Sequence, residues 1–97
     1  MIRIVKMEFA PENVEKFLSY FESIKELIRA QEGCQHLELL QDIHQPNIIF
    51  TYSYWVEESY LNQYRSSGLF QEVWANTKKY FIAKPLAWSV DTLYQLP

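Results

Sequence analysis

The residues between Tyr52 and Trp74 are the part of this chain whose side chains could do chemistry. They read Tyr-Ser-Tyr-Trp-Val-Glu-Glu-Ser-Tyr-Leu-Asn-Gln-Tyr-Arg-Ser-Ser-Gly-Leu-Phe-Gln-Glu-Val-Trp. Aromatic rings supplied by a strand and a helix can line a cavity with flat, polarizable surfaces, which suits a planar organic ligand. The segment carries no metal, phosphate or nucleophile signature. The sequence therefore predicts a pocket more directly than a reaction.

Four aromatic residues of this segment could either line a cavity or fill the core. Trp55, Tyr64 and Trp74 each have a polar tip that needs a hydrogen-bond partner when the ring is buried. For these three, core packing and a place in a binding site carry equal weight. Phe70 lacks such a tip and is more typical of core packing, because large aromatic residues usually dominate cores.

Other residues with catalytic side chains have simpler interpretations. Neither His36 nor His44 has a carboxylate and a nucleophile at a recognisable spacing, which favours surface or structural roles. Glu57 and Glu58 are adjacent, so they would not share a helix face, and they suit the first turn of a helix.

The lysines and the cysteine also suggest structural roles. Lys78, Lys79 and Lys84 form a thin basic cluster that is typical of a solvated helix end. Cys34 is the only cysteine, which excludes an intrachain disulfide and a multi-cysteine metal site. We interpret it as a small buried apolar residue.

Size and charge narrow the class of protein further. A chain of 97 residues has room for one domain, 1–97, and 48% hydrophobic residues is high for so small a core, which favours self-association. A net charge of −3 without a Lys/Arg block argues against nucleic acid and anionic membranes. No apolar run spans a bilayer and the first residues alternate charge, so a cytoplasmic protein is expected.

The elements that position these residues follow from hydrophobic periodicity. A helix that begins after Pro11 carries apolar residues every three or four positions as far as Ile28. Gly33 follows it where a left-handed C-terminal cap is expected. A second helical region starts at Glu57, is interrupted at Ser66–Gly68, and resumes with an apolar stripe to Phe81.

Strands are predicted in four places. Ile48 to Trp55 is almost entirely apolar, aromatic or β-branched and should be a buried central strand. Pro46 and Asn47 mark the turn before it. The predicted strands are Ile2–Phe9, Cys34–Asp42, Ile48–Trp55 and Leu86–Leu96, the last with Leu86, Trp88, Val90 and Tyr94 on one face and Asp91 on the other.

This order of elements predicts an α+β fold of the ferredoxin-like βαββαβ type. Its antiparallel sheet carries both helical regions on one face. The other face needs cover, and a second copy of the chain would supply it, in agreement with the surplus of apolar residues. A homodimer is therefore expected.

Several short patterns give the chain a resemblance to a known family. They are Pro11 after the first strand, Gly33-Cys34 at the start of the second, Pro46-Asn47 in the hairpin, Trp55 at the end of the third, and Ser67-Gly68-Leu69-Phe70 in the second helical region. Over nearly its whole length the chain resembles the antibiotic biosynthesis monooxygenase family of dimeric α+β barrels. The resemblance implies a cavity between sheet and helices in each subunit.

In the family, cofactor-independent members oxidise phenolic or quinol-like polycyclic substrates with a tryptophan late in the third strand and a nearby asparagine. Trp55 matches that tryptophan. Thr51 stands where the asparagine would be, on the same face of the strand, and its hydroxyl lacks the paired donor and acceptor of an amide. The resemblance therefore implies the pocket, while Thr51 departs from the family's oxygenase pattern.

A second branch of the family degrades haem with an asparagine, a tryptophan and a histidine. The corresponding positions here look like Val5, Tyr64 and Trp74. The histidine that would ligate iron is missing, and a Tyr64 phenolate is the alternative ligand. We expect no haem, metal or other cofactor.

The leading hypothesis is a cytoplasmic homodimer that binds a small planar phenol or quinol and oxidises it with dioxygen. Trp55 and Tyr64 are the predicted catalytic residues, Trp55 by stacking on or polarising the ligand and Tyr64 by hydrogen bonding. The predicted substrate-binding residues are Thr51, Trp74, Phe70 and Val5. The alternatives are a non-catalytic ligand-binding dimer, and an isomerase or lyase acting on a small metabolite.

Overall fold

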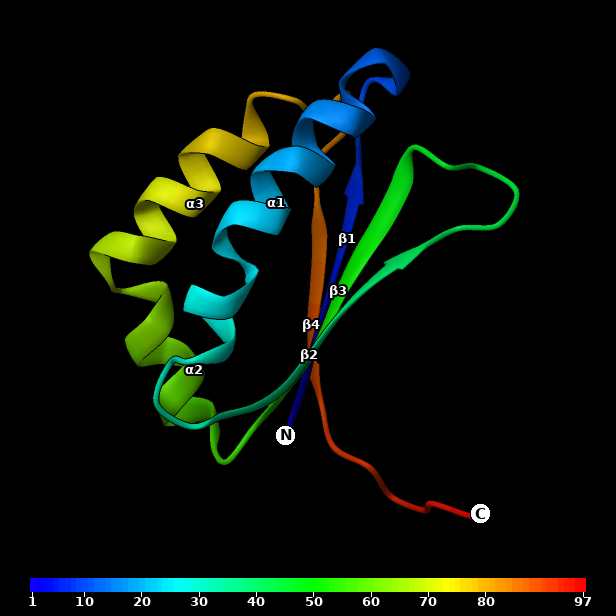
Figure 1. Cartoon of the computed structure of the whole chain (residues 1–97). Coiled ribbons are helices and arrows are strands. Elements are labelled where there is room, and N and C mark those ends of the chain that lie inside the picture. Colours follow the sequence, from blue (N-terminus) through cyan, green and yellow to red (C-terminus); the bar gives the residue numbers. More distant parts are fainter.

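Three α-helices cover one face of a four-stranded antiparallel sheet in the computed structural model, which describes residues 1–97 (Figure 1). The elements are β1 (Ile2–Glu8), a 3₁₀ turn (Pro11–Asn13), α1 (Val14–Arg29), β2 (Cys34–Gln41), β3 (Ile48–Trp55), α2 (Glu58–Arg65), α3 (Gly68–Lys78) and β4 (Leu86–Val90). The strand order is β2-β3-β1-β4. This is the predicted ferredoxin-like α+β fold, with β3 and β1 at its centre.

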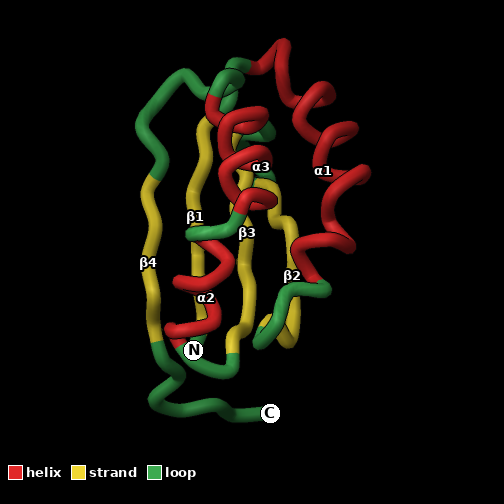
Figure 2. Tube along the Cα trace, turned by 90° about the vertical axis from the view of Figure 1, so that its left-hand side faces the viewer, coloured by secondary structure: helices red, strands yellow, loops and turns green.

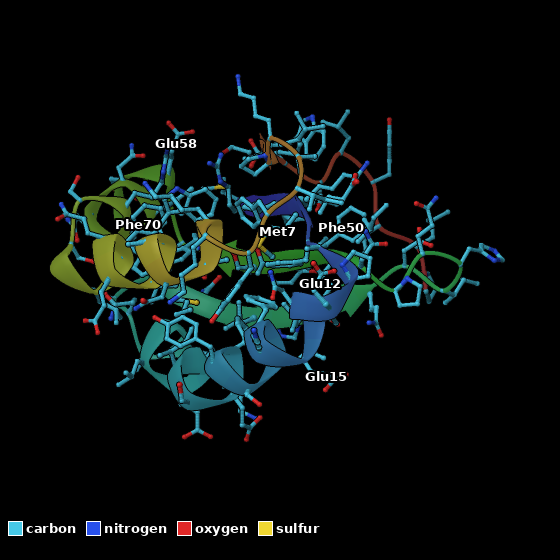
Figure 3. All side chains as sticks on the ribbon, turned by 90° about the horizontal axis from the view of Figure 1, so that it is seen from above. Met7, Glu12, Glu15, Phe50, Glu58 and Phe70 are labelled. Atoms are coloured by element: carbon cyan, nitrogen blue, oxygen red, sulfur yellow. The ribbon has the colours of Figure 1, made fainter.

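The register of the strands decides which side chains face the helices. Val5 of β1 pairs with Thr51 of β3, and Arg3 pairs with Ser53. Because side chains alternate between the two faces, these four and Trp55 point to the helical side. Figure 3 shows Phe70 on that side of the sheet and Phe50 on the other.

The second face of the sheet, here called the open face, has no helix over it. It is the side on which the β2–β3 loop and the C-terminal segment project (Figure 1). The strand registers assign to it Ile2, Ile4, Lys6, His36, Glu38, Leu40, Phe50, Tyr52, Tyr54, Leu86, Trp88 and Val90.

The core lies between the helices and the sheet. The apolar stripe of α1 supplies Phe17, Phe21, Ile24 and Ile28, all buried, as its spacing predicts. Phe9, which follows β1, stacks on Phe17 with ring centroids 4.4 Å apart. Close packing of this kind fixes α1 against the sheet.

The glycine expected to cap α1 has a different role. Gly33 does adopt the left-handed conformation, with φ +82°. The helix ends earlier, however, with Ala30 as its C-cap in a right-handed conformation. Gly33 therefore shapes the turn that leads into β2, where its carbonyl accepts a hydrogen bond from Val56 N at 2.9 Å.

The second helical region and the last strand both end earlier than predicted. The stripe that was expected to reach Phe81 stops with the helix at Lys78, because Phe81 pairs with Phe9 in an isolated bridge beside β1. The last strand ends at Val90 rather than Leu96, because Val90 pairs with Ile2, the first residue of β1. Tyr94 is consequently outside the sheet and 91% exposed.

The central strand β3 is buried mainly on the face that lies under the helices. Ile49, Ser53 and Trp55 are buried under the helices, whereas Tyr54 on the open face is 37% exposed. The prediction of a central strand is confirmed, and its burial is incomplete in the single chain because no helix covers the open face. No helix combines the length and apolar character that crossing a membrane requires.

Candidate functional site

A cavity of about 100 Å³ lies between the sheet and the helices, and mostly apolar side chains line it. The six residues that the sequence singled out all contribute to its wall: Val5, Thr51, Trp55, Tyr64, Phe70 and Trp74. They come from β1, β3, α2 and α3. The fold therefore brings the predicted residues together, while their roles stay predictions.

The break between α2 and α3 positions two of these side chains. Ser67 is the N-cap of α3, and its hydroxyl oxygen accepts a hydrogen bond from Phe70 N at 3.1 Å. The same hydroxyl donates to the carbonyl oxygen of Tyr64 at 2.6 Å. Serine is among the preferred N-cap residues because its oxygen satisfies a free amide of the first turn. One side chain thus fixes Tyr64 relative to Phe70.

Aromatic rings form a continuous wall from β3 to α3. Trp55 stacks on Tyr64 with centroids 5.7 Å apart and an interplanar angle of 21°. Tyr64 meets Phe70 edge to face at 5.2 Å, and Phe70 stacks on Trp74 at 5.9 Å. Such pairs prefer these offset and edge-on arrangements, so each ring holds its neighbour in place.

The polar tip of Trp55 is already used within the protein. Its indole N–H donates to the Ser53 hydroxyl at 2.9 Å, and both residues are buried. Trp55 can therefore offer a ring face to a ligand, and its N–H is not available to polarise one. This finding narrows the predicted role of Trp55 to stacking.

Two hydroxyl groups on the cavity wall remain for a ligand. Among the lining side chains, internal hydrogen bonds engage Thr77 with the carbonyl of Val73 and Trp55 with Ser53. The hydroxyls of Thr51 and Tyr64 have no such bond, and no polar side-chain atom of the chain is both fully buried and unpaired. Thr51 and Tyr64 can therefore bind a ligand oxygen.

Burial raises the pKa of the Tyr64 phenol far above its usual value, with smaller contributions from Cys34 and Tyr20. The phenol is consequently neutral at physiological pH. In that state it can donate a hydrogen bond, and it is a poor phenolate ligand for ferric iron.

The same shift makes protein stability depend on pH in the alkaline range. The unfolded chain releases the Tyr64 proton above about pH 10, whereas the folded chain retains it. The free energy of unfolding should therefore be unaffected by this group below about pH 10 and fall as the pH rises further. Urea unfolding at several pH values measures this dependence. Above about pH 10 the free energy of unfolding should fall less steeply for Tyr64→Phe than for the parent protein. Tyr94→Phe, which changes an exposed ring, should behave like the parent protein.

The histidines, the cysteine, and the charged residues at the helix ends lie outside the wall of the inner cavity. His36 is on the open face, with Nε2 3.3 Å from Glu38 Oε2, and His44 is exposed in the β2–β3 loop. Cys34 is buried and unpaired. Glu58 and Lys78 are the first residue of α2 and the last of α3. No group of histidine, cysteine and acidic residues could hold a metal ion.

Sequence reasoning missed the polar residues that share the helical face of the sheet. Arg3 lines the cavity, and the Ser53 hydroxyl accepts a hydrogen bond from the indole N–H of Trp55. Both could have been found from the alternation of the strands, because Arg3 lies two residues before Val5 and Ser53 two residues before Trp55.

Comparison with known proteins places these features in a family. The profile described as antibiotic biosynthesis monooxygenase matches residues 1–76. No protein of curated function matches the sequence. Among solved structures, a conserved protein from Methanosarcina mazei Go1 is 26% identical, with 89% of this chain and 86% of that chain covered and a TM-score of 0.82.

Two further structures share the fold at lower identity. An antibiotic biosynthesis monooxygenase is 15% identical, with 97% of this chain and 100% of that chain covered and a TM-score of 0.87. A protein from Mycobacterium tuberculosis is 12% identical, with coverage of 99% and 97% and a TM-score of 0.86. These likenesses extend over β4, which lies beyond the residues that the family profile matches.

Proposed function

Because this chain belongs to the antibiotic biosynthesis monooxygenase family, we propose that it binds a small planar phenol or quinol in the inner cavity and oxidises it with dioxygen. The observation that carries the proposal is the position of two unengaged hydroxyls, Thr51 and Tyr64, in a wall of stacked aromatic rings. Few polar groups in an apolar pocket are typical of sites that orient a ring by its oxygen.

The volume of the cavity limits the size of the ligand. An apolar protein cavity of about 150 Å³ holds one benzene molecule. The inner cavity, at about 100 Å³, is smaller than this, so it admits at most a single ring, and only when side chains on its wall move outward. The polycyclic substrates implied by the family resemblance are too large for it, so we restrict the proposal to monocyclic compounds.

The proposed reaction balances without a cofactor. A phenol C₆H₅OH and O₂ give a quinone C₆H₄O₂ and water, so one oxygen atom enters the ring and the other leaves as water. The substrate loses the hydrogens of its hydroxyl group and of one ring carbon and thereby supplies the electrons. Trp55 would stack on the ring, while Tyr64 donates a hydrogen bond to the ring oxygen.

Oxygen consumption with a set of monocyclic phenols and quinols tests this proposal. We expect Tyr64→Phe to lower kcat/KM about tenfold to a hundredfold, because one charge-stabilising donor is lost. Trp55→Phe should raise KM more than it lowers kcat, because a smaller ring stacks less well. Tyr94→Phe removes an exposed hydroxyl and serves as the matched control.

The outcome also separates the two candidate functions. Quenching of tryptophan fluorescence by these compounds without oxygen uptake would favour a non-catalytic binding protein of the same family. Thr51, in the place of the family's asparagine, is the observation that supports this second function. Turnover that is unchanged in both variants would remove Trp55 and Tyr64 from the mechanism.

We further propose that the active form is a homodimer, in which each copy contributes one domain of residues 1–97. The open face supports this, because five of its large apolar side chains are 37–48% exposed: Leu40, Tyr54, Leu86, Trp88 and Val90. Such a contiguous patch is unusual on a monomer. The buried free thiol of Cys34 fits a reducing compartment, and we propose the cytoplasm.

A further inference from the structure

A second hollow adjoins the inner cavity and shares lining residues with it. It has a volume of about 240 Å³. It is lined by Arg3, Val5, Arg65, Phe70, Trp74, Pro85 and Ala87. These residues come from β1, α2, α3 and the region of β4, which lies at the edge of the sheet beside α2 and α3 in Figure 2. We call this hollow the outer cleft.

The outer cleft and the inner cavity share part of their walls. Arg3, Val5, Phe70 and Trp74 line both. The stacked rings of Phe70 and Trp74 therefore stand at the boundary between the two spaces. Together the spaces reach the lower end of the range typical of ligand sites, roughly 300–1,000 Å³. A ligand longer than one ring could thus extend from the cavity into the cleft.

The outer cleft is positively charged. Arg3 and Arg65 are its only ionisable lining residues, and neither forms an ion pair with a carboxylate. Arg3 is half-buried, and its Nη1 donates to the Ser89 hydroxyl at 3.0 Å, which fixes the orientation of the guanidinium. Arginine stays protonated in proteins, so both charges are permanent.

The two arginines are close enough to influence each other. Partial burial lowers the pKa of Arg3, the charge of Arg65 lowers it further, and Glu58 acts in the opposite direction. Two cations in one hollow repel each other. The protein as a whole carries a net charge of −3, so the outer cleft is a positive patch on a negatively charged protein. An anion placed between them would relieve that repulsion.

We propose that the outer cleft binds the carboxylate of a ligand whose single aromatic ring occupies the inner cavity. The substrate class is then an aryl or arylalkyl carboxylate that also carries a ring hydroxyl for Tyr64. A guanidinium offers two parallel N–H donors to a carboxylate, and Arg3 and Arg65 supply two such groups. This inference rests on the proposed function, because it assigns the ring to the same cavity.

The proposal is tested with two ligands that differ in charge alone. 4-Hydroxyphenylacetate carries the carboxylate, and 4-hydroxyphenylacetamide is its neutral analogue. Isothermal titration of the full chain should give a Kd for the acid about tenfold to a hundredfold below that for the amide. Added salt should weaken binding of the acid and leave that of the amide unchanged.

Variants of the two arginines test whether these residues cause the preference for the acid over the amide. Arg65→Gln, which alters the outer cleft alone, should raise the Kd for the acid about tenfold and leave the Kd for the amide within twofold. Arg3 also lines the inner cavity, so Arg3→Gln should raise the Kd for the acid about tenfold more than it raises the Kd for the amide. Lys16→Gln removes an equal charge from an exposed position on α1, outside the cleft, and should change neither value. Circular dichroism of each variant checks that it folds, and Arg65→Lys should restore part of the preference for the acid.

The two ligands also separate the failure of this inference from that of the proposed function. If acid and amide bind equally well to the parent protein, the anion subsite is wrong and the cavity function stands. If neither ligand binds, the proposed function is wrong and the subsite falls with it. A preference for the acid that survives in both arginine variants overturns the assignment to Arg3 and Arg65.

Discussion

Replacing Gly33 by alanine should lower the free energy of unfolding by about 3 kcal/mol, which corresponds to a fall of roughly 15 °C in Tm. Two separate effects contribute. A residue with a side chain is strained at φ +82°, and a Cβ atom at this position would overlap the Cβ and Cγ atoms of Tyr60. Those Tyr60 atoms are next to the backbone, so a rotation of the ring does not relieve the overlap.

Gly68→Ala is the matched control for this change. Gly68 is the first residue of α3, and an added Cβ would meet no atom within 4 Å. Alanine has the higher helix propensity, so this variant should match or exceed the parent stability by about 0.5 kcal/mol. Thermal unfolding at one fixed protein concentration measures both, since dimerisation would make Tm depend on concentration. Equal Tm values for the two variants would contradict the argument.

A second substitution at the same position separates strain from overlap. Asparagine tolerates the left-handed conformation better than alanine, and it still carries a Cβ atom. If overlap with Tyr60 dominates, Gly33→Asn should be as destabilising as Gly33→Ala. If backbone strain dominates, the asparagine variant should recover about 1 kcal/mol.

The effect of Gly33 should extend to the ligand site. Tyr60 lies on α2 one helical turn before Tyr64, whose ring stacks on Trp55. A shift of α2 away from an added Cβ would therefore displace Tyr64 from the cavity wall. We expect Gly33→Ala to weaken ligand binding even at temperatures at which the variant remains folded.

Trp88→Glu should convert the proposed dimer to a monomer at micromolar concentration. Trp88 is on the open face, pairs with Ile4 of β1, and is 45% exposed in the single chain. In a two-fold symmetric dimer each substitution occurs twice at the interface. Loss of a buried aromatic ring and burial of a charge, counted in both copies, should raise the dissociation constant about a thousandfold or more.

Two leucines on different faces of the protein show whether the position of an added glutamate matters, or only its charge. Leu40 is on the open face and 42% exposed, whereas Leu27 is on α1 and 53% exposed. Light scattering should show that Leu40→Glu weakens the dimer and that Leu27→Glu does not. A parent protein that is monomeric at micromolar concentration would refute the proposed dimer before any variant is made.

The pattern of apolar residues was sufficient to predict most of the fold. The stripe of α1 and the break at Ser66–Gly68 are local signals, since each depends on residues close in sequence. The ends of α3 and β4 were not predictable in this way. Phe81 leaves the helix to pair with Phe9, and β4 stops where β1 has no further residue to pair with it. Both boundaries depend on partners far away in the chain.

The candidate site shows the same division between local and distant information. The resemblance and the aromatic pattern identified six residues that do line one cavity. The sequence did not reveal that Ser53 occupies the N–H of Trp55, because a hydrogen bond across two residues depends on the rotamers of both side chains. The approach of Arg3 to Arg65 was equally hidden, since β1 and α2 meet only in the folded chain.

The Ser67 hydroxyl, which bonds the carbonyl oxygen of Tyr64 and the backbone amide of Phe70, makes the shape of the inner cavity depend on a residue outside its wall. Tyr64 belongs to α2 and Phe70 to α3, and Ser66 and Ser67 join the two helices. The angle between the helices can therefore change while the residues on the cavity wall stay the same. A substitution of Ser67 can thus change the volume of the cavity without altering any residue that lines it.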